Sequence, residues 1–297
     1  MQAADSLRQR AALPNRLWRA LWGRGRPPLV PTLIILTFII LAIAPGLFAP
    51  QSPVAMSLPD RLKPPFWIDG GSTRHILGSD QLGRDILSRI VHGARVSLTV
   101  GLLAVLGGGA IGLFLGMIAG YAGGWVDVVL MRLVDGVLAI PWLLIALTFA
   151  ITLGPSERNL IIIIALFSST HYARVLRSDV LSVKSRQHVL AARILGASRR
   201  RILLRHILPH IGPTLIVLLT LQIGSVIIAE ASLSFLGAGI PPPAPAWGSM
   251  VSEGRDLIAR AWWVSFFPGL AIALVVLAFN LFGDWLRDRL DPRLTNA

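Results

Sequence analysis

The sequence contains no cysteine and little charge. Only 14% of its 297 residues are charged and 54% are hydrophobic, whereas a typical soluble domain is about 25% charged. The absence of cysteine excludes a disulfide framework, a Cys-ligated zinc, an iron–sulfur cluster and a thiol nucleophile. So few charged groups cannot cover a globule of this size, which excludes an ordinary cytosolic enzyme and a disordered chain. We therefore predict a membrane protein.

Several motifs that carry chemistry are also missing. The chain has neither the G-x-x-x-x-G-K-[ST] loop that binds nucleotide phosphates nor the H-E-x-x-H pattern of zinc proteases. Its six histidines are scattered. His206 and His210 lie four residues apart, but we expect them to meet lipid headgroups or a partner rather than a metal. Because no nucleophile and base cluster together, we expect no catalytic residue, metal site or cofactor in this chain.

Six apolar runs are long enough to cross a membrane, which takes about 20 residues of helix. They are residues 29–49, 96–120, 128–153, 159–176, 214–235 and 264–282. Lipid satisfies no backbone polar group, so each run should be helical. We predict an all-α integral membrane fold with six transmembrane helices, in which Pro141 kinks the third.

Lys and Arg are distributed unevenly around these runs. Of 28 such residues, 18 lie in residues 1–28, in residues 171–213 or after residue 282. Cytoplasmic loops carry the excess, so we expect both termini in the cytoplasm. The chain then divides into a basic cytoplasmic segment (1–28), a first transmembrane helix (29–49), an extracytoplasmic loop (50–95), a helical core (96–283) with a cytoplasmic loop at about 177–212, and a cytoplasmic tail (284–297). Because the arginines flank apolar runs, the net charge of +13 does not indicate nucleic-acid binding.

The basic N-terminal segment leaves two alternatives open. Leu13, Leu17 and Leu21 share one helical face, with Arg16 and Arg19 among them. This pattern suits a helix on the membrane surface, and a disordered basic tail explains it equally well.

A stripe of small residues and a few charges lie inside the predicted spans. The stripe consists of Ala104, Gly108, Gly112, Gly116 and Gly120, each four apart. Such a stripe lets another helix approach closely, and we favour packing within the chain over a dimer interface.

The charges inside the spans are Arg132, Asp135 and Glu230. Arg132 and Asp135 are three residues apart on one helix, so we predict a structural ion pair between them rather than a transport site. Glu230 either lines a pathway or caps a local loop.

The long cytoplasmic loop reads as two short helices separated by a glycine. Its run from Ala191 and Ala192 through Gly196 to Leu208 and Pro209 resembles the "EAA" loop of ABC-importer permeases. In that family the loop is the docking site for the ATPase. The family's glutamate position holds leucine here, so no role of that carboxylate carries over. We expect Pro209 to restart the chain before the fifth span.

Four further segments are similar to the dipeptide, oligopeptide and nickel class of these permeases. They are residues 77–98, 123–135, 232–248 and 279–294, so the resemblance covers nearly the whole chain. Within that class the chain looks like the C-type subunit. The resemblance implies a type I importer core of five helices plus an N-terminal helix, in a bacterial inner membrane.

The resemblance also implies partners. These are a second homologous permease, two cytoplasmic ABC ATPases that bind ATP and Mg²⁺, and an extracytoplasmic substrate-binding protein. Transport would then proceed by alternating access, with peptides or a related solute such as a nickel chelate as substrate. The rival hypothesis is an ion-coupled secondary transporter that uses Arg132, Asp135 and Glu230. Such transporters usually contain repeated halves, and none is visible here.

Overall fold

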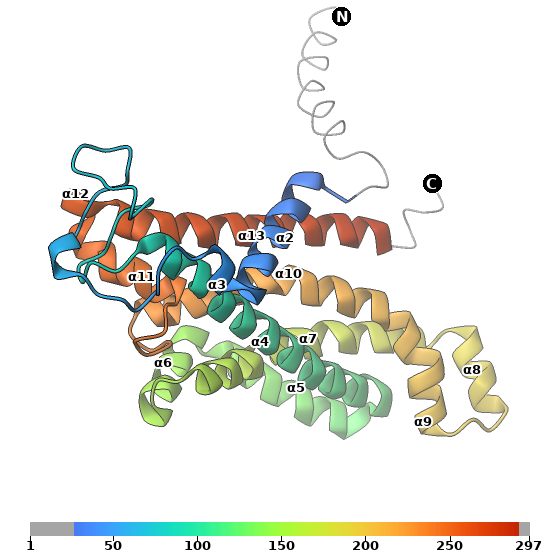
Figure 1. The fold of residues 1–297 in the computed structure, drawn as a ribbon. Coiled ribbons are helices and arrows are strands. Elements are labelled where there is room, and N and C mark those ends of the chain that lie inside the picture. The colour runs from blue at the N-terminus through green and yellow to red at the C-terminus, as the bar shows by residue number, and fades with distance from the viewer. Residues whose placement is uncertain (1–26, 291–297) are drawn as a thin grey trace, which may run out of the picture.

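The computed structural model describes residues 27–290 as a helical bundle (Figure 1). Its helices are α2 (Leu29–Ile43), α3 (Pro45–Phe48), α4 (Ile86–Ala122), α5 (Gly124–Ala139), α6 (Trp142–Leu153), α7 (Glu157–Lys184), α8 (Gln187–Ile194), α9 (Arg199–Arg201), α10 (Leu208–Phe235), α11 (Trp247–Gly254), α12 (Ile258–Ala261) and α13 (Trp263–Leu290). A π-helix spans Ile202–Ile207. The predicted all-helical class is confirmed. Both interpretations of the N-terminal segment lie outside the described residues, as does the end of the predicted tail.

Four helices are long and apolar enough to cross a membrane. They are α4, α7, α10 with the helical turns that precede it, and α13. The bent pair α5 and α6 makes a fifth crossing if it counts as one span. Helix α2 has 15 residues and is therefore only about 22 Å long, short of a bilayer core of about 30 Å. The predicted count of six is therefore not confirmed.

Two prolines explain where the structure departs from the predicted runs. Pro141 lacks a backbone N–H and disfavours the helical conformation in the residue before it. Ile140 is accordingly extended (φ −100°, ψ 135°), and α5 and α6 meet at 86°. The expected kink is thus a full break. Pro45 acts in the same way on Ala44 (φ −127°, ψ 59°) and ends α2 early.

The stripe of small residues packs α4 against α7. A Cβ built on Gly112 would lie 2.4 Å from the Tyr172 Cβ, and one built on Gly116 would lie 2.9 Å from the Ala173 carbonyl oxygen. Only glycine permits this approach of two backbones. Packing within the chain, the favoured alternative, is confirmed, and the α4–α7 pair forms the centre of the bundle (Figure 1).

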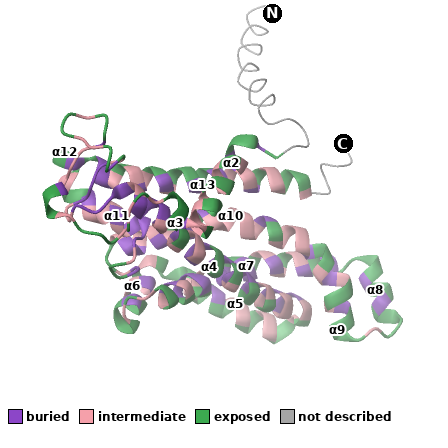
Figure 2. Cartoon of the chain, viewed as in Figure 1, coloured by how far each residue is buried: buried purple, intermediate pink, exposed green. Residues whose placement is uncertain are grey.

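A buried ionic network joins the 50–85 loop to α11 at one end of the bundle. Arg84 and Arg89 each bind both Asp80 and Glu253, with nitrogen–oxygen distances of 2.5–2.7 Å. Asp80 is fully buried and the two arginines nearly so. Figure 2 shows buried residues gathered around α11 at this end. The network therefore links the loop to α4 and α11. Removal of one of these charged groups would leave another buried charge without its full set of partners, which is costly.

Candidate functional site

Helices α8 and α9 form a hairpin at the other end of the bundle (Figure 1). We call residues 187–207, which include the π-helix, the α8–α9 hairpin. Gly196 lies at its turn with φ +78° and no other atom within 4 Å of a built Cβ. This φ favours glycine, because other residues are strained there. The predicted helix–glycine–helix arrangement is therefore present.

The α8–α9 hairpin has a small hydrophobic core of its own. Val189, Ile202, Ile207 and Ile211 are fully buried or nearly so, together with Val180 from α7. This core ties the hairpin to α7 and α10. In contrast, Ile194 and Leu195 beside the glycine are each 86% exposed. Ile194 and Leu195 thus make a small exposed apolar patch at the end of α8, which is a candidate contact surface for another protein.

The five motif residues of the predicted loop divide by burial. Ala192 is buried, whereas Ala191 on α8 and Gly196 at the turn are exposed. Leu208 and Pro209 begin α10, and Leu208 packs on the hairpin core. The expectation that Pro209 restarts the chain is wrong, because the π-helix runs directly into α10 and absorbs the proline without a break.

Two histidines of the hairpin, His188 and His206, approach His210 at the start of α10. The ring of His188 stacks on that of His210, with centroids 4.6 Å apart, and lies 6.5 Å from that of His206. Within residues 27–290 no group of three histidines or carboxylates is arranged to hold a metal ion. The expected absence of a metal site stays a prediction for the whole chain.

A cavity of about 730 Å³ lies beside the break between α5 and α6, and α7 and α10 complete its wall. Ligand pockets for small molecules span about 300–1,000 Å³, so the volume suits a small solute. The break itself contributes Ala139, Ile140, Pro141 and Trp142 to the wall. The residues at the bend therefore form one side of the cavity.

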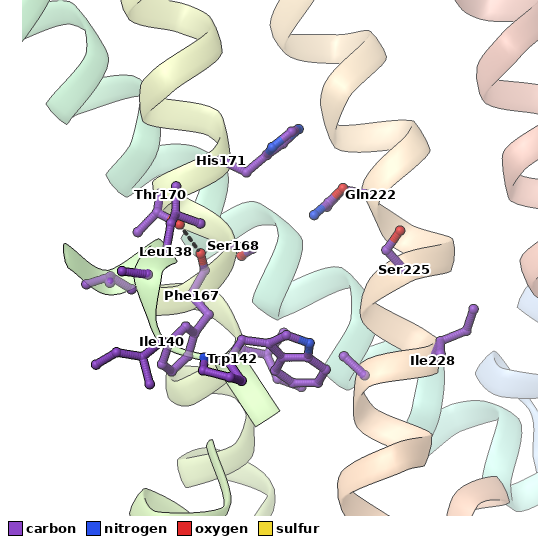
Figure 3. Close-up of a pocket in the computed structure, with 15 residues that line it drawn as sticks. Leu138, Ile140, Trp142, Phe167, Ser168, Thr170, His171, Gln222, Ser225 and Ile228 are labelled. Carbon is purple, nitrogen blue, oxygen red and sulfur yellow. Dashed lines mark hydrogen bonds between the residues drawn. The ribbon is translucent and has the colours of Figure 1, made fainter. Parts of the chain in front are cut away.

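The polar groups of this cavity come from two facing helices. Ser168, Thr170 and His171 belong to α7, and Gln222 and Ser225 belong to α10. Figure 3 shows Gln222 lying between the two helices with His171 across from it. The residues that line the cavity include no aspartate, glutamate, lysine or arginine. Such a wall offers hydrogen bonds without holding a charged solute tightly.

The predicted pair of Arg132 and Asp135 is wrong. Asp135 instead forms its ion pair with Arg174 on α7, and both side chains are about half exposed. A second pair, Arg177 with Asp127, is bidentate at 2.5 Å and more buried. Both pairs link α5 to α7. The spacing of residues along one helix cannot reveal an ion-pair partner that lies on another helix.

Glu230 does not line the cavity. It is fully buried in α10, where it accepts hydrogen bonds from Ser234 (2.7 Å) and from Ser97 on α4 (3.2 Å). Burial of a carboxyl is costly unless hydrogen bonds satisfy it. These bonds join α10 to α4 and cap no loop, so Glu230 has a structural role that neither alternative describes.

Sequence reasoning missed the two cavity residues of α10. Gln222 and Ser225 are polar, three residues apart, and lie within an otherwise apolar run. That spacing puts them on one helix face, and polar residues at membrane depth usually face a cavity. The signal was therefore present in the sequence.

Comparisons with known proteins agree over most of the chain. Residues 112–296 match the family described as "Binding-protein-dependent transport system inner membrane component". The di/tripeptide transport system permease protein DppC of Pseudomonas aeruginosa is 44% identical over 283 residues, which cover 95% of this chain and 93% of that protein. The glutathione transport system permease protein GsiD of Escherichia coli is 44% identical over 280 residues, covering 93% and 91%.

Solved structures with the same fold are also transporters. A chain of the MetNI methionine ABC transporter in an inward-facing conformation matches 69% of this chain and 98% of its own length, with a TM-score of 0.58 and 17% identity. A chain of an amino acid ABC transporter matches 68% and 94%, with a TM-score of 0.52 and 16% identity. The family match and the relatives that are 44% identical leave the ion-coupled alternative without support. The chain is a type I ABC permease and belongs to the family of binding-protein-dependent transport system inner membrane components.

Proposed function

We propose that this permease carries di- and tripeptides, or closely similar small peptides, across the bacterial inner membrane. The observation that carries the proposal is the uncharged cavity beside the α5–α6 break, whose largely apolar wall holds polar groups from α7 and α10. Its volume suits a short peptide, and its amide, hydroxyl and imidazole groups suit the amides of a peptide backbone. Relatives that are 44% identical over nearly the whole chain are named as di/tripeptide and glutathione permeases, which supports the same substrate class.

Transport is driven from the α8–α9 hairpin. Two partner ATPases bind ATP and Mg²⁺ and receive Ile194 and Leu195 in a surface groove. When the ATPases close, the hairpin moves, and its core transmits that movement to α7 and α10, which form the cavity wall. Rigid movement of packed helices between two arrangements is a common basis of switching. ATP hydrolysis belongs to the partners, so this chain is not itself an enzyme.

A second, homologous permease completes the passage from the other side. Both termini and the α8–α9 hairpin face the cytoplasm, and an extracytoplasmic binding protein delivers peptide at the opposite end. This orientation rests on the excess of Lys and Arg in residues 1–28, in residues 171–213 and in the tail.

The test is uptake by the complex expressed from the neighbouring genes and reconstituted in liposomes with its binding protein. We expect ATP-dependent uptake of labelled dipeptides and tripeptides, and a mass that accounts for two permeases and two ATPases. A nickel chelate serves as the competing substrate. Uptake driven by an ion gradient without ATP, or competition by the chelate but not by peptides, would contradict the proposal.

A further inference from the structure

The 50–85 loop presents two exposed aromatic side chains on a tight turn. Phe66 and Trp67 are 51% and 52% exposed. Backbone hydrogen bonds from Ile68 to Pro65 (2.9 Å) and from Gly71 to Ile68 (2.8 Å) close the turn. A Cβ on Gly71 would lie only 2.2 Å from the Pro65 carbonyl oxygen. The turn is therefore compact, and it holds both rings outward.

These rings join an aromatic cluster at the start of α13. The centroid of Trp67 lies 5.1 Å from that of Phe66 and 6.1 Å from that of Phe267. Trp262 continues the cluster, 5.7 Å from Phe267 and 5.3 Å from Phe266. Contacts of this kind are favourable. The tip of the loop is thus fixed beside the end of a helix long enough to span a membrane.

The cluster continues an exposed apolar stripe along α13. The stripe repeats every three or four residues and consists of Phe266, Leu270, Leu274 and Leu277, which are 36–56% exposed. Just before the helix the chain turns polar, with Arg255, Asp256 and Arg260. Trp262 therefore lies at the boundary between the charged stretch and the apolar stripe.

We propose that Phe66 and Trp67, together with Trp262 and Phe266, insert into the headgroup region of the bilayer and anchor the 50–85 loop there. Tryptophan is enriched at the membrane–water interface because its ring is amphipathic. Lipid is the occupant that fits, since the patch runs without interruption into the apolar face of a membrane-length helix. Helix α13 packs on α2, α10 and α11 but contributes no residue to the cavity wall, which comes from the α5–α6 break, α7 and α10. A second permease that completes the passage would meet those helices instead.

The absence of cysteine allows a direct test with a single nitroxide label. We label Trp67→Cys in the full chain, purified with its co-expressed subunits and placed in lipid nanodiscs, and measure collision with oxygen and with a water-soluble nickel complex. Arg74→Cys, on the same loop with a 65% exposed side chain, is the matched control. The complex that contains the cysteine-free chain gives the background from the other subunits.

We expect the ratio of oxygen to nickel collisions at Trp67 to be severalfold higher than at Arg74, because oxygen concentrates in lipid. A ratio equal to that at Arg74 would overturn the proposal, because the tip would then lie in water. A label shielded from both reagents would also overturn it, since a protein partner would then cover the tip. Phe66→Cys repeats the measurement, so that one poorly assembled variant does not decide the result.

Discussion

Gly196 combines a left-handed backbone with open space, so a side chain there tests conformation and docking without a clash inside the chain. Gly196→Ala should strain the turn by about 1 kcal/mol and leave membrane insertion intact. We expect substrate-stimulated ATP hydrolysis by the complex to fall severalfold.

The matched control for this change is Gly154→Ala. Gly154 also has a positive φ (+81°) and no atom within 4 Å of a built Cβ, but it lies between α6 and α7, at the end of the bundle opposite the hairpin. If both substitutions lower ATP hydrolysis equally, the effect is general strain, and the docking role of the hairpin is wrong.

A second prediction at the scale of single residues concerns Asp60. The Lys63 ammonium, 2.6 Å away, and the Ser57 hydroxyl hold the pKa of the Asp60 carboxyl well below its usual range. The ionised form is favoured in the folded state, so its contribution to stability is present above the unfolded pKa of about 3.9 and is lost as pH falls through the folded pKa.

Asp60→Asn should therefore lower the melting temperature of the purified protein by the same amount at pH 7 and at pH 5. Thermal unfolding in detergent at both pH values measures this effect. The control is Asp69→Asn, at an exposed position of the same loop, which should leave the melting temperature unchanged at both pH values. A difference at pH 7 that vanishes at pH 5 would show that another group causes the effect.

At the scale of helices, the contact between α4 and α7 depends on glycine. Gly112→Ala would place a Cβ 2.4 Å from Tyr172 and 2.6 Å from the Ser169 carbonyl oxygen. Since one of these atoms belongs to the backbone, the helices must separate, and overpacking costs about 1–3 kcal/mol. We expect less folded protein in the membrane and a lower melting temperature.

Gly136→Ala is the control on another helix. A built Cβ there meets nothing within 4 Å, and alanine is favoured over glycine inside a helix by about 0.5–1 kcal/mol. The variant should be as stable as the parent or more so. If Gly112→Ala behaves like Gly136→Ala, close α4–α7 packing is not what the stripe provides.

The two ion pairs between α5 and α7 should differ in strength. Asp127 and Arg177 are bidentate and partly buried, with side chains 14% and 31% exposed, so the pair should contribute on the order of 1–2 kcal/mol. Asp135 and Arg174 are 55% and 54% exposed and should contribute less than about 1 kcal/mol.

A double-mutant cycle for each pair, read from thermal unfolding, separates these contributions. Alanine at Asp127 and Arg177 should show clear coupling, and alanine at Asp135 and Arg174 should show little. Coupling between Arg132 and Asp135 would restore the interpretation that the structure contradicts.

For the whole molecule, the decisive question is whether the cavity is the passage. Ser225→Trp places a large ring in the cavity and should abolish peptide uptake, while the complex still assembles and hydrolyses ATP. Ile216→Trp is the control, because nine residues are 2.5 helical turns and put it on the opposite face of α10. Uptake that survives Ser225→Trp would exclude this cavity from the path.

Much of this architecture could be predicted from the sequence because lipid forces apolar runs into helices. The runs at 96–120, 159–176, 214–235 and 264–282 all lie inside observed helices. The positions of Pro45 and Pro141 predict that a helix is disturbed, but the 86° angle at Pro141 depends on packing against α7 and α10. The partner of Asp135 and the cavity itself depend on tertiary contacts, which one sequence does not reveal.

The glycine stripe also has a consequence for synthesis. Helix α4 ends at residue 122 and its partner α7 ends at residue 184, so 62 residues separate their completion. At a synthesis rate of about 5–20 residues per second, this takes about 3–12 s. Until the matching part of α7 has been made, the stripe lacks this partner from its own chain. The half-made chain therefore exposes, within the membrane, a backbone surface that any other small-residue helix could bind.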